Sequence, residues 1–281
     1  MIKPLSIFFF LIKFLDKIIY FIFKKSLYPK LIDFCSKHSY RNIKILDRNI
    51  SFYVPSDIVE YRVNTIFTKE PETINWINQF DNSEKLTFWD IGANIGLYSI
   101  YNALKNKNSK TIAFEPSTSN LRVLSRNISI NNLQEDISIC QIPLTNKENE
   151  FLNMSESTFE EGGALNSFGV NFDYNGKKIK KSFMNYKLLG TNIDYLIKNK
   201  ILELPNYIKI DVDGIEHLIL QGGINHLNNK TIKSILIEVN EEFEDQSKNV
   251  LNILKDNSFK LSSKTKQLNN IFNYIFSRVE K

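Results

Sequence analysis

Cysteine, proline and glycine are all scarce in this sequence of 281 residues. Two cysteines, Cys35 and Cys140, are too few for a disulfide framework, which favours a reducing compartment and a cytoplasmic protein. With 7 prolines and 10 glycines, the composition is neither collagen-like nor linker-like. A hydrophobic content of 42% with 24% charged residues excludes a disordered chain and is typical of a folded one.

Most of the chain also lacks net charge. The formal charge of +5 comes from residues 1–30, which hold six lysines and one aspartate, whereas the other 251 residues carry 30 charges of each sign. The body of the chain therefore has no excess positive charge of the kind that attracts nucleic acid, and we expect no nucleic-acid partner. Attraction to an anionic membrane surface is expected only through residues 1–30.

A hydrophobic segment runs from Leu5 to Phe23, where 15 of 19 residues are apolar or aromatic. As a helix it would have a wide apolar face and a narrow polar stripe that includes Lys13, Asp16 and Lys17. Three arrangements fit: a helix lying in the membrane plane, a helix packed on its own domain or on a partner copy, and a transmembrane span. We therefore expect a cytoplasmic protein, with peripheral attachment to the inner face of the membrane as the further option.

Strand and helix patterns alternate from residue 86 onward. Before that point, residues 40–55 predict a pair of strands and residues 71–80 predict a helix. The alternation predicts an α/β fold with a mostly parallel sheet and ligands at the carboxyl ends of its strands. This divides the chain into an N-terminal helix (1–30), a strand and helix extension (31–85) and the main domain (86–281).

Residues 145–190 interrupt the alternation. Asn175-Gly176 stands between two short runs and predicts a β-hairpin. Because loops on a rigid sheet commonly determine which substrate binds, we expect this insertion to contact the substrate.

The strongest motif is a strand that delivers Asp90 into a tight loop, after which a helix opens. Gly92 would let the backbone approach a ligand closely, and Gly96 would let the helix pack on the strand. Asp90 and Asn94 can hold the ammonium and the carboxylate of a zwitterion. Glu115 ends the next strand, where a carboxylate can accept both hydroxyls of a ribose. The loop lacks the G-x-G-x-x-G pattern of dinucleotide-binding proteins, which argues against a nicotinamide oxidoreductase.

A second group of ionisable residues follows a later strand and includes Asp211, Asp213, Glu216 and His217. A substrate hydroxyl is a poor nucleophile at neutral pH. To react, it needs a carboxylate or histidine that takes its proton, or a divalent cation such as Mg²⁺ held by carboxylates. Asp211, His217 and Glu238, which ends the following strand, are the candidate catalytic residues. Asp213 can instead shape the turn before Gly214, and Glu216 can instead complement a helix dipole. The sequence names no metal ligands.

In these motifs the sequence resembles the FkbM family of S-adenosylmethionine-dependent methyltransferases. The resemblance covers roughly residues 50–277 and rests on three ordered segments, 90–96, 114–116 and 208–216. It implies a class I methyltransferase fold, which is a Rossmann-like, mostly parallel seven-stranded sheet with helices on both faces. It also implies O-methylation, often of a sugar within a glycan, a glycolipid or a natural product.

The resemblance also implies roles for individual residues. Asp90, Gly92, Asn94 and Gly96 would line the methionine half of S-adenosylmethionine, and Glu115 would hold its ribose. The expected function is therefore methylation of a sugar hydroxyl on a small-molecule or glycan acceptor. The alternative is a membrane-docked binding protein that keeps the fold without catalysis.

Overall fold

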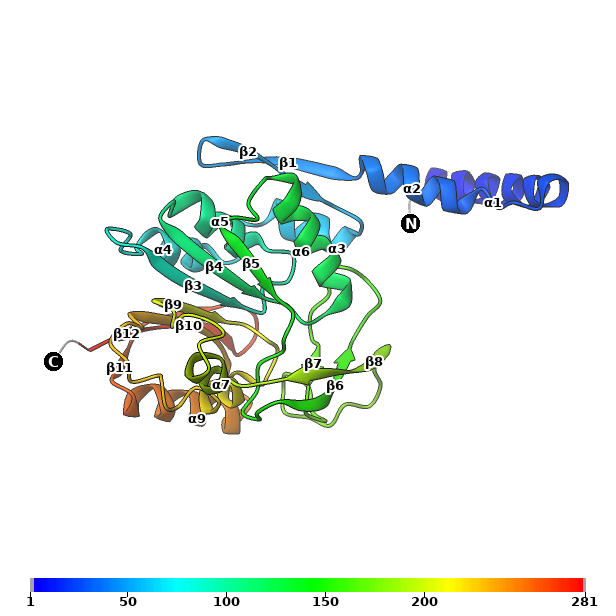
Figure 1. Ribbon diagram of the computed structural model, residues 1–281. Coiled ribbons are helices and arrows are strands. Elements are labelled where there is room, and N and C mark those ends of the chain that lie inside the picture. Colours follow the sequence, from blue (N-terminus) through cyan, green and yellow to red (C-terminus); the bar gives the residue numbers. More distant parts are fainter. Residues whose placement is uncertain (1–2, 280–281) are drawn as a thin grey trace. The chain divides into compact units, whose positions relative to one another are not determined.

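The computed structural model describes residues 3–279, which divide into two compact units between Tyr40 and Arg41 (Figure 1). Residues 1–2 of the expected N-terminal helix, and residues 280–281 of the expected main domain, lie outside the described range. The first unit contains the helices α1 (Lys3–Phe23) and α2 (Tyr28–His38). Over the described residues, no helix is both long and apolar enough to cross a membrane.

Asp16 joins the two helices of the first unit. Its Oδ1 accepts hydrogen bonds from the hydroxyl of Ser26 at 2.8 Å and from the backbone N–H of Leu27 at 2.5 Å. This places the aspartate at the N-terminal end of α2, where the helix dipole favours a negative charge. Large apolar side chains remain exposed along α1, namely Ile7, Phe8, Phe9, Phe10, Leu11, Phe14, Leu15, Ile18, Tyr20, Phe21, Ile22 and Phe23.

The second unit begins with the strand pair β1 (Tyr40–Ile45) and β2 (Arg48–Tyr53), followed by α3 (Asp57–Asn64) and α4 (Pro71–Asn78). The predicted strand pair and the predicted helix at Pro71 are confirmed, whereas α3 was not expected from the sequence. Asn127, on a helix of the main domain, accepts a hydrogen bond from the backbone N–H of Tyr53 at 2.8 Å. This extension therefore belongs to the same compact unit as the main sheet.

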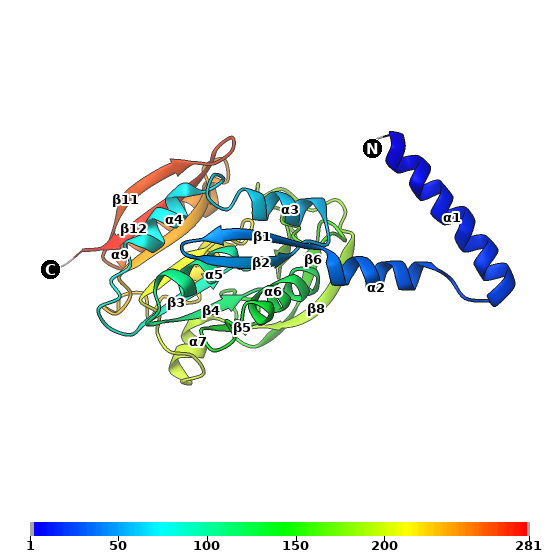
Figure 2. The ribbon, with the colours of Figure 1, turned by 90° about the horizontal axis from the view of Figure 1, so that it is seen from above.

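The main sheet has seven strands in the order β11-β12-β10-β9-β3-β4-β5. Figure 2 shows β11 and β12 at one side of this sheet and β4 and β5 at the other. Strand β12 runs antiparallel to both of its neighbours, and the remaining pairs are parallel. This topology confirms the expected class I methyltransferase fold. The strands are β3 (Leu86–Ile91), β4 (Ser109–Phe114), β5 (Ile137–Cys140), β9 (Tyr207–Ile210), β10 (Ser234–Asn240), β11 (Phe259–Lys266) and β12 (Ile271–Arg278).

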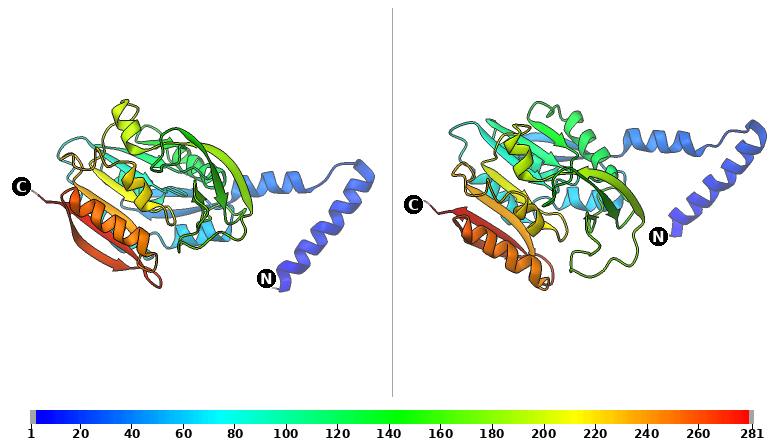
Figure 3. Two further views of the ribbon diagram at one scale, coloured as in Figure 1. Left: turned by 90° about the horizontal axis from the view of Figure 1, so that it is seen from below. Right: turned by 60° about the horizontal axis from the view of Figure 1, so that its bottom comes forward.

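Helices cover both faces of this sheet, and the central strands β3 and β9 are accordingly buried along their whole length (Figure 3). On β3, Phe88 contacts Trp76 of α4 and Asp90 contacts α5, whereas Trp89 and Ile91 join the core on the other face. The helices of the main domain are α5 (Leu97–Lys105), α6 (Thr118–Ile130), α7 (Ile193–Lys198), α8 (Glu216–Gln221) and α9 (Glu244–Asp256).

The insertion forms a separate three-stranded sheet in the order β7-β6-β8, built from β6 (Glu150–Glu156), β7 (Ser167–Phe168) and β8 (Met184–Gly190). At the predicted hairpin the turn forms, but the strand pairing is reduced to one bridge between Phe172 and Lys178. Asp173 Oδ1 accepts the backbone N–H groups of Asn175 at 2.9 Å and Lys177 at 3.0 Å. These bonds fix the turn through a side chain.

Candidate functional site

The loop after β3 approaches the end of β9 so closely that only glycine fits at its first position. Gly92 has a φ of +86°, and a Cβ there would lie 1.9 Å from the carbonyl oxygen of Asp211. Gly96 has a φ of +87°, and its missing Cβ makes room for Leu124 of α6. Gly92 thus shapes the ligand edge, whereas Gly96 acts by packing α5 on α6.

Asp90 is sealed beneath this loop. It is 1% exposed, and its Oδ2 accepts the hydroxyl of Ser99 at 2.6 Å. Burial raises the pKa of Asp90, and the nearby ammonium group of Lys209 opposes that rise. Within the described chain, Asp90 does not line the pocket described below, and its Oδ1 is buried without a hydrogen-bond partner.

Glu115 follows β4 and is held by the backbone on both of its oxygens. Oε2 accepts the N–H of Asn94 at 2.8 Å, and Oε1 accepts the N–H of Ser117 at 2.9 Å. Burial nevertheless raises the pKa of Glu115 to about 8, against the lowering effect of these two hydrogen bonds. The carboxyl group is therefore fixed in position, and its charge changes near neutral pH.

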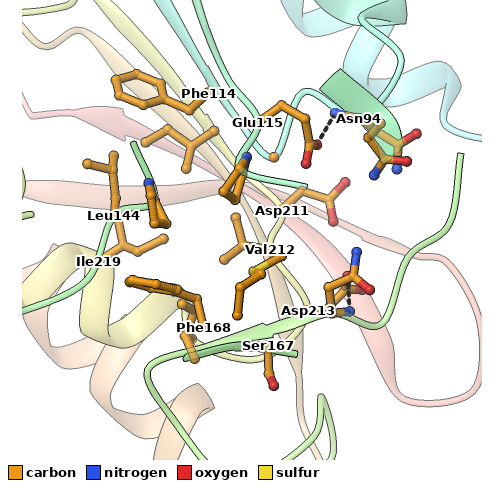
Figure 4. Close-up of a pocket in the computed structure, with 18 of the residues that line it drawn as sticks. Asn94, Phe114, Glu115, Leu144, Ser167, Phe168, Asp211, Val212, Asp213 and Ile219 are labelled. Atoms are coloured by element: carbon orange, nitrogen blue, oxygen red, sulfur yellow. Dashed lines mark hydrogen bonds between the residues drawn. The ribbon is translucent and has the colours of Figure 1, made fainter. Parts of the chain in front are cut away.

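A pocket of about 610 Å³, counted out to its open mouth, lies at the carboxyl ends of β3, β4 and β9. Its polar end contains Asn94, Glu115 and Asp211, and its apolar end contains Leu144, Phe168 and Ile219 (Figure 4). The Oδ1 atom of Asn94 is buried there without a hydrogen-bond partner in the described chain. An unpaired buried acceptor is costly, which indicates that a ligand donor belongs at this position.

Residues 157–166 of the insertion, which we call the strap, reach over this pocket. The carbonyl of Gly163 accepts hydrogen bonds from the side chains of Asn94 at 2.9 Å and Asn120 at 3.1 Å. The carbonyl of Gly162 accepts one from Arg62 Nε at 2.7 Å. The strap is therefore fastened both to the Gly-containing loop and to helices on either side of it.

Asp211 stands at the end of β9 and lines the pocket. Its Oδ2 lies 2.7 Å from Nζ of Lys209, a lysine that is 1% exposed. Burial alone would raise the pKa of Asp211, but the ammonium groups of Lys209 and Lys69 outweigh it and hold that pKa below its ordinary value. Asp211 is therefore a stable anion and a weak proton acceptor.

Asp213 also lines the pocket and fastens the strap. Its Oδ2 accepts the backbone N–H of Leu165 at 2.7 Å. Burial, followed by the charge of Asp211, raises the pKa of Asp213 to about 6. Asp213 thus binds a proton more readily than Asp211, whereas two aspartates in water would bind protons equally well.

The two other candidate catalytic residues do not line this pocket in the described chain. Glu238 lies on β10 beside Asp211, since Ile237 pairs with Ile210. Burial and the charge of Asp211 raise the pKa of Glu238 well above its ordinary value. His217 is 2% exposed and packs edge-on against Phe243, and burial lowers its pKa.

Glu216 has a structural role. Its carboxylate accepts the backbone N–H groups of Val212 at 3.1 Å and Gly214 at 3.0 Å, and so it shapes the turn after β9. Glu216 also lies in the first turn of α8, as the helix-dipole role considered for it requires, and the turn contacts were not expected from the sequence. Over residues 3–279, no group of three or more histidine, cysteine, aspartate or glutamate side chains is arranged to hold a metal ion.

The fold is that of a class I methyltransferase. Residues 90–261, more than half of the chain, match the model of the methyltransferase FkbM domain, and the chain therefore belongs to this family. A curated relative, methyltransferase sdnD of Sordaria araneosa, is 27% identical over 173 residues. That match covers 53% of this chain and 64% of the relative, slightly less than two thirds of its length.

Solved structures are similar at lower identity. The methyltransferase FkbM from Methylobacillus flagellatus KT has 16% identity and a TM-score of 0.46, over 79% of this chain and 56% of that one. TYW2 of M. jannaschii, solved in complex with AdoMet, has 13% identity and a TM-score of 0.43, over 86% of this chain and 87% of that one.

Sequence reasoning did not identify Arg62, Lys69, Asn120 or Lys209 as site residues. One signal was present for Lys209, because a lysine inside the apolar strand Tyr207–Ile210 needs a buried partner. Arg62 and Lys69 had no such signal, since only the packing of α3 and α4 brings them to the ligand edge.

Proposed function

We propose that this chain is an S-adenosylmethionine-dependent O-methyltransferase whose acceptor is a sugar hydroxyl of a glycan, a glycolipid or a related metabolite. The observation that carries the proposal is the pocket with Glu115 and Asn94 at its polar end and Leu144 and Phe168 at its apolar end. This division suits a ligand with an apolar base, a ribose and a charged tail. When bound, the cofactor supplies an electrophilic methyl group on a sulfonium ion.

The side chains of this protein orient the acceptor hydroxyl and provide a group that takes its proton. The ionised Asp211 lies at the pocket wall, where its charge favours a sulfonium and can orient a hydroxyl. The acceptor oxygen would form a bond to the methyl carbon as the bond from that carbon to the sulfonium sulfur breaks and leaves a neutral thioether. The proton of the acceptor hydroxyl would pass to a carboxylate. Asp213 is suited to take that proton because it lines the pocket and its pKa is about 6.

The test compares cell-surface glycans and glycolipids by mass spectrometry from cells with the gene, without it, and with an Asp211→Asn copy. We expect loss of one methyl group from an acceptor when the gene is absent. The Asp211→Asn copy should lower methylation by about 10²-fold if this carboxylate orients the acceptor. Binding of S-adenosylmethionine without any methylated product would instead favour the non-catalytic binding protein.

We also propose that the first unit lies on an anionic membrane surface. Support comes from the exposed apolar side chains of α1 and from the lysines at positions 13, 17, 24, 25 and 30. Each lysine near an anionic surface contributes about 1 kcal/mol, and this contribution weakens with salt. Asp16, which bonds to the start of α2, opposes the attraction less than a free carboxylate would.

Flotation of the full chain with vesicles tests this membrane contact. We expect the chain to float with phosphatidylcholine vesicles that contain phosphatidylglycerol, and to bind less at high salt. A Lys13→Gln, Lys17→Gln double variant should float less, and Lys147→Gln in the second unit should behave as the wild type. Equal binding to neutral and anionic vesicles would contradict the electrostatic part of the proposal.

A further inference from the structure

The insertion carries a local excess of positive charge. Residues 171–183 contain four lysines and one aspartate, whereas the charges of the whole chain beyond residue 30 cancel. The aspartate, Asp173, accepts backbone N–H groups of its own turn. Within residues 3–279 the four lysines are exposed and form no ion pair, and we call them the basic patch: Lys177, Lys178, Lys180 and Lys181.

The segment that carries the basic patch is anchored at both ends near the ligand edge of the main sheet. At its start, Asn240, the last residue of β10, donates a side-chain hydrogen bond to the carbonyl of Tyr174 at 3.0 Å. The same tyrosine packs on Gly214 in the turn after β9, where a Cβ would lie 2.9 Å from its Cα. At its end, the N–H of Phe183 donates to the carbonyl of Glu156 at 2.9 Å. The four lysines are therefore held between the turn after β9 and the sheet of the insertion.

Two exposed aromatic rings from different parts of the insertion meet beside the basic patch. Phe159 of the strap is 63% exposed and Phe183 is 52% exposed, and their ring centres lie 5.6 Å apart. Nζ of Lys181 lies 5.1 Å from the ring centre of Phe183, so the lysines and the aromatic pair form one surface. The strap also supplies Gly163 and Asn166 to the wall of the pocket. This surface therefore adjoins the pocket.

The combination of exposed aromatic rings and unpaired cations suits an acidic glycan. The apolar C–H face of a sugar ring can pack on an aromatic ring, while carboxylates of the glycan pair with lysines. The basic patch spreads over five residues of irregular, extended backbone, which span up to about 13 Å. Such a spread suits a chain with repeated negative charges better than a single phosphate group. Because the surface adjoins the pocket, one acceptor chain can occupy both.

We propose that the basic patch, Phe159 and Phe183 form an outer subsite for an acidic glycan, a chain of carboxylate-bearing sugars of which one enters the pocket. The proposal rests on the proposed function and narrows its acceptor from glycans in general to carboxylated ones. The lysines also offset the repulsion that Asp211 and Asp213, in the pocket wall, exert on an acidic acceptor.

Calorimetry of the full chain with tetragalacturonate and with neutral maltotetraose tests this subsite. We expect the wild type to prefer tetragalacturonate, with an affinity that falls as salt is raised. Replacing all four lysines of the basic patch by glutamine should weaken tetragalacturonate by about 10-fold or more at low salt. The matched control removes the same net charge at the ends of α5 and α7, where four exposed lysines also lack ion pairs: Lys105→Gln, Lys107→Gln, Lys198→Gln and Lys200→Gln.

Two further measurements locate the ligand on this surface. In the wild type, tetragalacturonate at about ten times its Kd should slow acetylation of the basic patch by about 10-fold, as followed by mass spectrometry. Acetylation of Lys105 and Lys107 should not change. Phe159→Ala and Phe183→Ala should each weaken tetragalacturonate by about 3-fold or more. Phe151→Ala, at an exposed ring near the other end of β6, is the control.

Binding of S-adenosylhomocysteine, measured on the same wild-type sample, separates the ways in which the proposal can fail. Equal affinity for the two tetrasaccharides in a chain that binds S-adenosylhomocysteine would overturn the subsite and leave the proposed methyltransferase in place. Equal weakening by the two quadruple variants would also overturn it, because net charge alone would then be responsible. A basic-patch variant that keeps its affinity for tetragalacturonate but floats less with phosphatidylglycerol vesicles would identify a membrane contact instead. A wild type that does not bind S-adenosylhomocysteine would overturn the proposed function and the subsite together.

Discussion

Glu115 is the residue whose charge state should govern cofactor binding. Its pKa of about 8 means that most molecules of the free protein carry a protonated Glu115 at pH 7. A carboxylate accepts hydroxyl hydrogen bonds more strongly than a carboxylic acid, so binding requires loss of this proton. We expect affinity for S-adenosylhomocysteine to rise by about 10-fold between pH 7 and pH 9, as measured by calorimetry.

Glu115→Gln should remove this pH dependence and weaken binding at pH 9. The exposed Glu135→Gln should retain the wild-type profile. An affinity that stays constant over this range in the wild type would contradict the assignment of the ribose to an ionised Glu115.

Lys209 is a buried cation that favours the ionised forms of two carboxylates, Asp90 and Asp211. Lys209→Met would remove the largest positive charge acting on Asp90 and Asp211, and breaking a buried pair in this way costs about 3–5 kcal/mol. Urea unfolding at pH 7 should show that loss, whereas Lys85→Met at an exposed pair should change the free energy of unfolding by less than about 0.5 kcal/mol.

The loss of unfolding free energy in Lys209→Met should depend on pH. Without Lys209, burial would raise the pKa of Asp90 further above its unfolded value, and the pKa of Asp211 would rise as well, so the folded variant would bind more protons than the folded wild type. The destabilisation should therefore shrink as the pH falls from 7 to 5. A loss that is equal at both values would show that these carboxylates do not depend on Lys209 for their charge.

The strap is the element that should control how fast the cofactor enters and leaves. Asn120 of α6 holds it twice, by donating to the carbonyl of Gly163 and by accepting the N–H of Gly162 at 2.9 Å. Asn120→Ala should speed dissociation of S-adenosylhomocysteine by about 10-fold, since two hydrogen bonds are lost. Stopped-flow fluorescence measures this rate, and Ser125→Ala on the same helix is the control.

Protease cleavage gives a second measurement of the strap. Phe159 is 63% exposed, so chymotrypsin should cut there in the free protein. Bound S-adenosylhomocysteine should slow this cleavage in the wild type and protect Asn120→Ala less. Cleavage at one rate with and without the ligand would show that the strap does not respond to it.

At the scale of the whole molecule, the division into two compact units predicts that vesicle binding and cofactor binding can be separated. No residue that lines the candidate cofactor pocket in the described chain precedes Ile91. Removing residues 1–40 should therefore leave the affinity for S-adenosylhomocysteine and the melting temperature of the second unit unchanged, while vesicle binding is lost. Calorimetry and flotation of the truncated chain measure both. A truncated chain that unfolds or still floats would contradict this division.

Local sequence pattern determined the type and order of most elements of the main domain. The alternation of strands and helices predicted the parallel sheet, because residue spacing sets which side chains share a face. The resemblance carried by the motifs around Asp90, Glu115 and Asp211 added its seven strands and its class. These motifs also located the ligand edge, since the carboxyl ends of parallel strands meet there.

Only the tertiary structure decided which side chains meet at that edge. Asp90 and Lys209 are both near Asp211 in the fold, yet one is sealed below the loop and the other is used to hold a carboxylate. Arg62 and Lys69 reach the site through the packing of α3 and α4, which no local pattern encodes. Burial then sets the charge states, because the free energy of an ionised group depends on every neighbour that replaces water around it.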